Sequence, residues 1–191
     1  MFRRKESQLA RERATEYATC KDFRQIFSED MAGLHLLAYL LTADSVKAEQ
    51  CFVAGLEDSI HGNLVFKQWA RAWSKRAIIQ NAIKVMSPVP GERRNAQETV
   101  PGPQNGNASE NPLVAMVTSW TAFERFVFVM SVLEGYSLRE CSALLACSDH
   151  DVMSAKSQLL QRLAGEPSQA AALSAWNRKR WTAFFATAQM A

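Results

Sequence analysis

Residues 134–163 read EGYSLRECSALLACSDHDVMSAKSQLLQRL and decide the fold that we predict for the second half of the chain. Ser137 precedes Glu140 by three residues, which is the spacing of a capping box, in which a hydroxyl and a carboxylate satisfy free N–H groups at a helix start. The run SDHD at 148–151 supplies another N-cap, and the positive end of the helix dipole favours its acids. The stretch therefore predicts two helices that are separated by a tight turn.

A further capping box, Thr121 with Glu124, begins a helix that contains the apolar run FVFVMSVL, and Gly135 is a usual residue for leaving a helix. Two more helices follow over about 138–146 and 149–164. Two helices joined by a tight turn form a helix-turn-helix unit, whose second helix can enter the major groove of DNA.

The candidate DNA-binding side chains of this unit lie on the early positions of the last helix, in the turn before it and at the start of the preceding helix. They are Arg139, Ser148, His150, Met153, Ser154, Ser157 and Gln158. The last helix carries no net charge, and the acids Asp149 and Asp151 at its leading end repel phosphates. The residues alone leave two interpretations open, a helix that reads DNA and a helical hairpin that serves packing.

Residues 87–112 hold five of the six prolines of the chain and no periodic apolar pattern, which predicts a flexible linker. Turn residues are scarce outside it, which argues against an all-β fold. We therefore predict an all-α protein of two small helical domains joined by this linker, over 21–86 and 113–165. The second of these domains is the helix-turn-helix, and a tail over 166–191 follows it.

The first domain has apolar side chains at three- and four-residue spacings, which predicts helices over about 21–41, 45–60 and 64–85. Asp44 is a candidate N-cap for the second of these helices. The sequence His-Gly-Asn at 61–63 is the expected stop and turn before the third.

The stretch over 134–163 resembles the fourth region of bacterial RNA polymerase sigma factors, especially the extracytoplasmic-function group. Its matching residues are Glu134, Gly135, Tyr136, Ser137, Glu140, Leu144, Leu145, Cys147, Ser148, Val152 and Ser154. The run LHLLAYLLTADSVKAEQCF at 34–52 resembles the start of the second region of the same family, and Phe66 and Trp69 stand where that region has aromatic residues. The resemblance covers about residues 30–165, and the linker falls where the family places its own.

The resemblance implies a protein that binds core RNA polymerase and directs it to promoter DNA for transcription initiation in the cytoplasm. The second region would hold the polymerase and open the −10 element, and the fourth would read the −35 element. The residues implied at the polymerase contact are Ala48, Glu49, Gln50 and Val53. An anti-sigma or other regulatory protein is a further implied partner, whereas no cofactor, catalytic residue or small-molecule substrate is required.

The chain departs from the family pattern at two places. Val53 and Ala54 stand where the family has a glutamine and an acid that grip the polymerase. Met153 and Ala155 stand where the reading helix has cations, and fewer cations weaken contacts with phosphates and bases. The alternative function is therefore a helix-turn-helix regulator or a protein-interaction module that has lost initiation activity.

Aromatic and basic residues cluster in the third helix of the first domain. In the family, aromatic residues near this position help melt promoter DNA by stacking on unpaired bases. We expect Trp69 to lie in the core, whereas for Trp73 core packing and DNA contact both stay open. Arg71, Lys75 and Arg76 are candidates for phosphate contacts, and an ordinary solvated helix face is the alternative.

The two ends of the chain have their own patterns. The tail over 166–191 combines aromatic residues with the basic run RKR at 178–180, which predicts an amphipathic helix. Such a helix could dock on the helical domain, bind a partner or touch a membrane surface. Residues 3–17 are helix-prone but have few apolar anchors.

Several classes of protein are excluded. No apolar run is long enough for a transmembrane helix, and the charged N-terminus lacks the apolar segment of a secretory signal. The three histidines lie far apart, so we expect no metal site, and no motif predicts an enzyme. The four cysteines are interpreted as reduced thiols. The net charge of +3 is too small to indicate nucleic-acid binding by itself.

Overall fold

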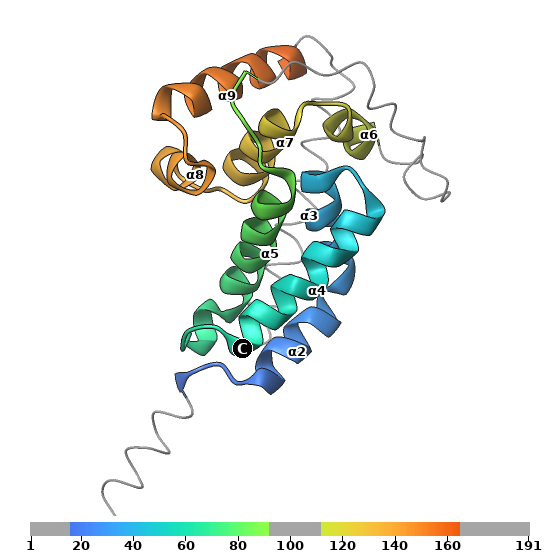
Figure 1. Ribbon diagram of the computed structural model, residues 1–191, viewed down its shortest axis with the longest axis vertical. Helices are drawn as coiled ribbons and strands as arrows, with labels where there is room; N and C mark the ends of the chain where they lie inside the picture. Colours follow the sequence, from blue (N-terminus) through green and yellow to red (C-terminus); the bar gives the residue numbers. More distant parts are fainter. Residues whose placement is uncertain (1–15, 92–111, 165–191) are drawn as a thin grey trace, which may run out of the picture. The chain divides into compact units, whose positions relative to one another are not determined.

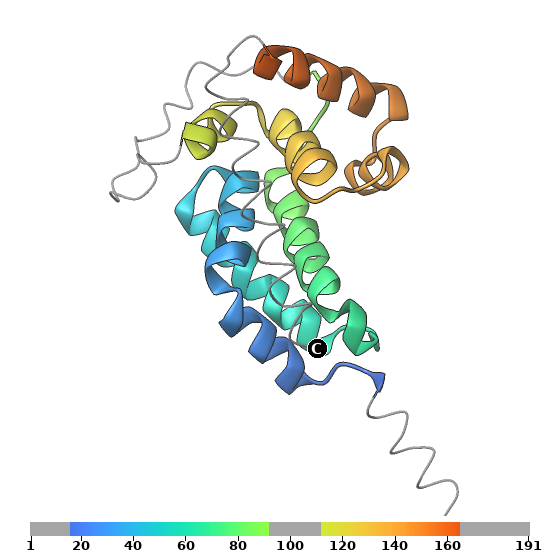
Figure 2. The ribbon, with the colours of Figure 1, turned by 180° about the vertical axis from the view of Figure 1, so that it is seen from behind.

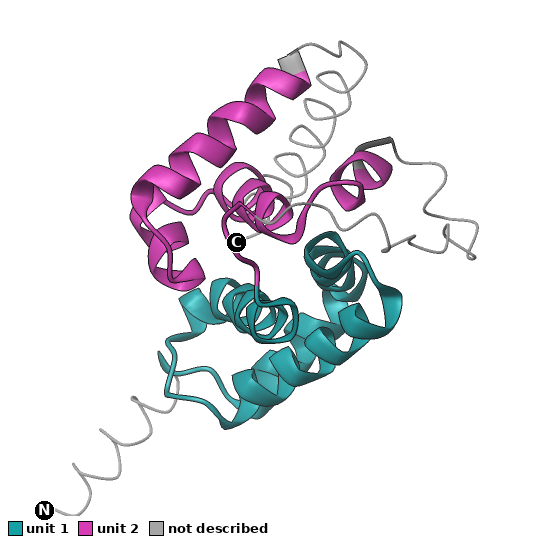
Figure 3. Cartoon of the chain, turned by 45° about the horizontal axis from the view of Figure 1, so that its top comes forward, with its two compact units in different colours: residues 1–87 teal, residues 88–191 magenta. Residues whose placement is uncertain are grey.

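The computed structural model of this 191-residue chain describes residues 16–91 and 112–164. Within these ranges the chain is helical apart from its loops and one isolated antiparallel bridge (Figures 1 and 2), which confirms the predicted all-α class. The chain divides into two compact units, Met1–Ser87 and Pro88–Ala191, which Figure 3 colours separately. Most of the predicted helix over 3–17, most of the linker and the whole tail over 166–191 lie outside the described residues.

The first unit is built from helices that pack along one another. Their bounds are α2 Cys20–Glu29, α3 Met31–Thr42, α4 Ser45–His61, the 3-10 helix η1 Lys67–Trp69 and α5 Ala70–Met86. The predicted cap of α4 is confirmed, because the Asp44 carboxylate accepts hydrogen bonds from the N–H groups of Val46 and Lys47 at 2.9 and 3.0 Å. A fixed start for α4 also fixes which of its side chains face the core.

The prediction of one continuous helix over 21–41 is wrong, because the chain leaves the helical conformation at Asp30 (φ −111°, ψ 26°). Asp30 donates its N–H to the Ile26 carbonyl at 3.0 Å and accepts the Leu34 N–H at 2.9 Å, so it ends one helix and begins the next. The apolar pattern could not reveal this break, since the buried Phe27 and Leu34 are seven residues apart, as in an unbroken helix.

The start of the third helix also differs from the prediction. Instead of beginning near residue 64, the chain runs extended up to Phe66, makes the 3-10 turn η1 and enters α5 at Ala70. Val65 is buried in this segment, and its carbonyl accepts the Ala18 N–H at 2.7 Å. This backbone hydrogen bond ties the segment before α5 to the chain that precedes α2.

The second unit contains the predicted helices and one more. Their bounds are α6 Pro112–Thr118, α7 Ala122–Phe128, the π-helix η2 Val129–Leu133, α8 Leu138–Leu145 and α9 Asp149–Ala164. The predicted linker ended at residue 112, whereas α6 begins there, and proline is well suited to the first position of a helix. The predicted helix after Thr121 continues from Val129 as a π-helix. The apolar pattern of the sequence does not distinguish a π-helix from an α-helix.

The core of the second unit forms around α7 and η2. Phe126, Phe128 and Met130 are fully buried, and the rings of Phe128 and Trp120 meet edge to face with centroids 5.0 Å apart. Arg125 is buried among them, and its guanidinium donates a hydrogen bond to the Trp120 carbonyl at 2.7 Å, which compensates part of the cost of burying the charge. Among the described helices of both units, none is long and apolar enough to cross a membrane.

Helix α4 lies close against α5 at Gly55, and we predict that a larger residue there separates the two helices. A Cβ atom on Gly55 would lie 2.6 Å from Cγ1 of Ile78 and 3.2 Å from its backbone N and Cα. Gly55→Val should therefore lower the free energy of unfolding by about 1–3 kcal/mol in urea titrations followed by circular dichroism.

Ala32→Val is the matched control for this variant, because Ala32 is exposed on α3 and a valine there has room. Its expected cost is only the helix-propensity difference, roughly 0.5 kcal/mol. Equal unfolding midpoints for the two variants would show that α4 and α5 are not held together at Gly55.

Candidate nucleic-acid interface

The turn between α8 and α9 is the feature that sets the orientation of α9. Helix α8 ends at Ala146, which takes the left-handed conformation (φ 50°) and donates its N–H to the Ser142 carbonyl. The Cys147 N–H also reaches the Ser142 carbonyl, at 3.1 Å. The Ser142 hydroxyl donates to the Asp149 carboxylate, so the same residue of α8 holds both the turn and the first residue of α9.

Helix α9 begins on a reciprocal cap, as the sequence predicts. The Asp151 carboxylate accepts the N–H and the hydroxyl of Ser148 at 3.1 and 2.6 Å, and the Asp151 N–H donates back to that hydroxyl at 3.1 Å. The Ser148 hydroxyl and backbone lower the pKa of Asp151, so this carboxyl stays ionised at neutral pH. Ser148 is thus engaged in the cap, although its side chain is exposed.

One face of α9 packs inward, and the opposite face carries the predicted DNA contacts. Val152, Leu159 and Leu163 are buried, at spacings that place them on one side of the helix. The exposed members of the predicted set are Arg139, Ser148, His150, Met153, Ser157 and Gln158, and Ser154 is half-buried. The sequence did not single out Leu160, which is 43% exposed on this helix.

The exposed face of α9 is poor in available positive charge. Arg162 forms an ion pair with Glu124 of α7, which ties the end of α9 to the start of α7. Lys156 is half-buried near Cys141. Arg139, at the start of α8, remains the exposed cation of the predicted set in this unit.

A second surface lies at the start of α5, where aromatic rings pack in a row. Tyr17 and Phe66 form the antiparallel bridge, and their rings stack with centroids 4.7 Å apart at 20°. The Trp69 ring meets Phe66 edge to face at 5.2 Å and 90°. Trp69, the last ring of this row, is 57% exposed, and Leu64 in the segment before it is 79% exposed.

The two tryptophans of this segment differ in exposure. Trp69, which we expected in the core, is largely exposed. Trp73 is half-buried against the cluster of Phe23, Val65 and Ala70, and its indole N–H is buried without a hydrogen-bond partner among the described residues. Trp69, at the end of η1, is therefore the more exposed aromatic ring of this segment, whereas Trp73, for which the sequence leaves core packing and DNA contact both open, packs partly in the core.

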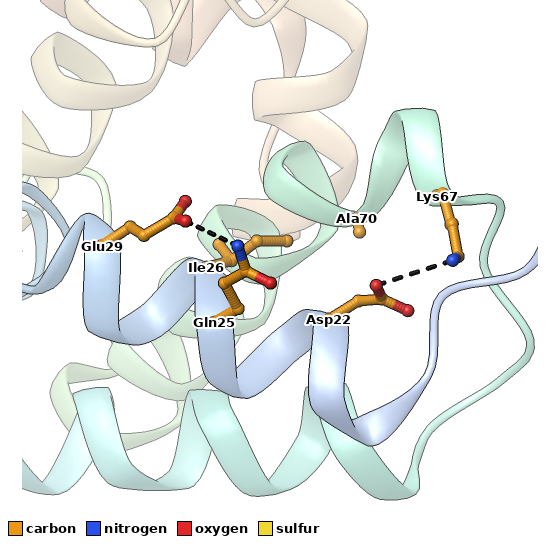
Figure 4. Close-up of a pocket in the computed structure, with 6 residues that line it drawn as sticks. All are labelled: Asp22, Gln25, Ile26, Glu29, Lys67 and Ala70. Carbon is orange, nitrogen blue, oxygen red and sulfur yellow. Dashed lines mark hydrogen bonds and ion pairs between the residues drawn. The ribbon is translucent and has the colours of Figure 1, made fainter.

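The cations that flank Trp69 pair with Asp22 and Glu29 of α2 and with Asp30, which follows it; these three are called the acids of α2 below. Lys67 Nζ lies 3.7 Å from Asp22 Oδ1, and the Arg71 guanidinium lies 3.5 Å from Glu29 and 3.3 Å from Asp30. A groove of about 170 Å³ lies between α2 and the start of α5, and Asp22, Glu29 and Lys67 are among the residues that line it (Figure 4). Lys75 and Arg76, the other predicted phosphate contacts, are half-buried.

The predicted polymerase contact falls on α4. Glu49, Gln50 and Val53 are exposed on this helix. Ala48 is fully buried in the core, so its side chain is not available to a partner and its assignment as a contact residue is wrong. The register explains this result, because Ala48 lies two turns before Gly55 on the face that packs inward, next to the buried Cys51.

The cysteines of the second unit have raised pKa values, and the described residues include no cluster of metal ligands. Burial raises the pKa of Cys141 to about 11, and burial together with Asp151 and Asp149 raises the pKa of Cys147, so both thiols stay protonated at neutral pH. No group of three or more potential metal ligands occurs among the described residues.

No protein-family model matches the chain, and a search of curated proteins finds no match. Function is therefore inferred from the residues and their geometry.

Glu124 is the residue for which we predict a pH-dependent contribution to stability. Burial alone would raise its pKa, but the hydrogen bonds from Arg162 and Thr121 outweigh burial and lower the pKa below its usual value of 4.5. A carboxyl with a lowered folded-state pKa stabilises the fold above its unfolded-state pKa, and this stability is lost as pH falls through the folded-state value.

Glu124→Gln should therefore cost about 1 kcal/mol at neutral pH, because it removes the charge that Arg162 and the Thr121 cap bind. In urea unfolding experiments the deficit should shrink as pH falls through the lowered folded-state pKa, because the wild-type carboxyl then becomes protonated. Glu57→Gln, on the exposed face of α4, should show no such convergence. A deficit that is independent of pH would contradict this role of Glu124.

Proposed function

We propose that the chain is a divergent sigma-like transcription factor that binds core RNA polymerase and promoter DNA in the cytoplasm, without catalytic chemistry or a cofactor. The observation that carries this proposal is the α8–α9 pair. Two capped helices joined by a short turn bury one face of the second helix and expose His150, Ser157 and Gln158 on its other side. Its sequence is the part of the chain that most resembles the family.

The first unit supports the same proposal through a different kind of contact. Trp69 is exposed between Lys67 and Arg71, and an aromatic ring between cations suits single-stranded nucleic acid, whose bases stack and whose phosphates pair with cations. Phe66 contacts the Trp69 ring edge to face. The two units thus offer different chemistry, base stacking at α5 and hydrogen-bonding side chains on α9.

A second candidate is a helix-turn-helix interaction module without initiation activity. Met153 is 53% exposed and Leu160 is 43% exposed, so the outer face of α9 is partly apolar. Arg162, a cation of the same helix, is engaged by Glu124. An apolar helix face with few cations suits a protein partner better than it suits a phosphate backbone.

Polymerase binding separates these two candidates. The full chain should retain bacterial core RNA polymerase in a pull-down and support promoter-directed transcription in a reconstituted assay. Glu49→Lys should lower retention by about tenfold, because it reverses a charge at the proposed contact on α4. Glu57→Lys makes the same change two turns further along the helix and should leave retention unchanged.

A folded chain that retains no polymerase would rule out the sigma-like function. Retention of polymerase by a chain that supports no promoter-directed transcription would favour the interaction module.

The outer face of α9 is tested with duplex DNA that the wild-type chain enriches from a random pool. Ser157→Glu combined with Gln158→Glu places two negative charges where base contacts are proposed, and both positions are exposed, so folding should be kept. Binding should fall by roughly tenfold or more in anisotropy titrations. Ala32→Glu with Ala143→Glu adds the same charge at exposed positions on other helices and should have a smaller effect. Equal losses would show that α9 does not read DNA.

A further inference from the structure

Acids of α2 neutralise the cations on both sides of Trp69. Asp22 reaches Lys67 at 3.7 Å, and Glu29 and Asp30 both reach the Arg71 guanidinium, at 3.5 and 3.3 Å. The pairs join the beginning and the end of α2 to the start of α5. The surface that we propose for single-stranded DNA therefore carries its counter-charge within its own unit.

The structure holds these acids in place. Asp22 and Glu29 are seven residues apart, so they share one side of α2. The Asp22 carboxylate accepts the N–H and the hydroxyl of Thr19, each at 2.7 Å. The Glu29 carboxylate accepts the Gln25 amide at 2.7 Å, as Figure 4 shows. Both carboxylates thus face the groove that separates α2 from α5, at the positions where phosphates would meet Lys67 and Arg71.

The pairs are weakly held, which allows exchange. About half of the Arg71 and Glu29 side chains is exposed, 51% and 52%, and ion pairs in water are weak and screened by salt. The anchor of α2 is instead apolar, since Phe23 and Phe27 are buried in the core. A phosphate can therefore replace a carboxylate on Arg71 while α2 stays in place.

We propose that the acids of α2 compete with nucleic-acid phosphates for Lys67 and Arg71, and so lower the affinity of the Trp69 surface. This inference rests on the proposed function, because it requires that single-stranded DNA binds at this surface. The ion pairs lower the affinity for DNA, because a phosphate can bind Arg71 only after it displaces the carboxylates of Glu29 and Asp30. A single strand, whose bases can also stack on Trp69, should displace these carboxylates more readily than inorganic phosphate does.

The test compares two variants of the full chain that have the same net charge. Glu29→Gln with Asp30→Asn removes the two acids on Arg71. Glu16→Gln with Glu57→Gln removes two exposed acids that form none of the ion pairs described here. With fluorescein-labelled single-stranded DNA of about 16 nucleotides, the first variant should bind between about two- and tenfold more tightly than the control.

Salt dependence and a double-mutant cycle identify the cause. The released Arg71 should add one phosphate contact and steepen the slope of log K against log salt by about 0.7 for a single strand. In an Arg71→Gln background, Glu29→Gln with Asp30→Asn should give no further tightening beyond the control. Tightening that persists in this background would overturn the inference, and so would a first variant that equals the control.

A Trp69→Ala variant separates failure of the inference from failure of the proposed function. If Trp69→Ala weakens binding while the two charge variants bind equally, DNA uses this surface and only the competition by α2 is overturned. If the wild-type chain binds no single-stranded DNA, the proposed function of this surface fails and the inference fails with it. Circular dichroism of each variant shows whether its helices are intact.

Discussion

Helices in both units begin on the same interaction, in which a serine or threonine hydroxyl and a carboxylate three residues later cap each other. It starts α2 at Thr19, α7 at Thr121, α8 at Ser137 and α9 at Ser148. Each cap fixes the first turn of its helix and therefore the direction of every side chain after it. The exposure of Ser157 and Gln158 on α9 follows from the cap at Ser148 together with the burial of Val152.

The caps also link local structure to tertiary electrostatics. The carboxylate of Glu124 caps α7 and binds Arg162 of α9, and that of Asp22 caps α2 and binds Lys67 before α5. One acid thus serves both a helix start and a distant cation. For the proposed function, the consequence is that Lys67, Arg71 and Arg162 are already paired with acids, and such cations attract a phosphate backbone less strongly than unpaired ones do.

The sequence predicted the starts of capped helices well, but it did not predict the uncapped start of α5 or which side chains pack between helices. Caps depend on residues three positions apart, so Ser137, Ser148 and Asp44 were assigned correctly. The break at Asp30 was missed because the apolar period runs through it, and α6 was missed because its residues follow a proline-rich stretch. At the candidate site, Trp69 ends η1 and Trp73 follows four residues later in α5, and no periodic pattern tells which of them meets Phe23 and Val65.

The sequence by itself determined the all-α class, the capped α8–α9 pair and the set of exposed polar residues on α9, because helix caps and apolar periodicity act over a few residues. Only the tertiary structure decided that Trp69 points to solvent, that Ala48 is buried and that Arg71 is held by α2. These outcomes depend on contacts between helices that are distant in the chain. Arg71 and Asp30 are separated by 41 positions, and their pairing requires α2 to pack beside the start of α5.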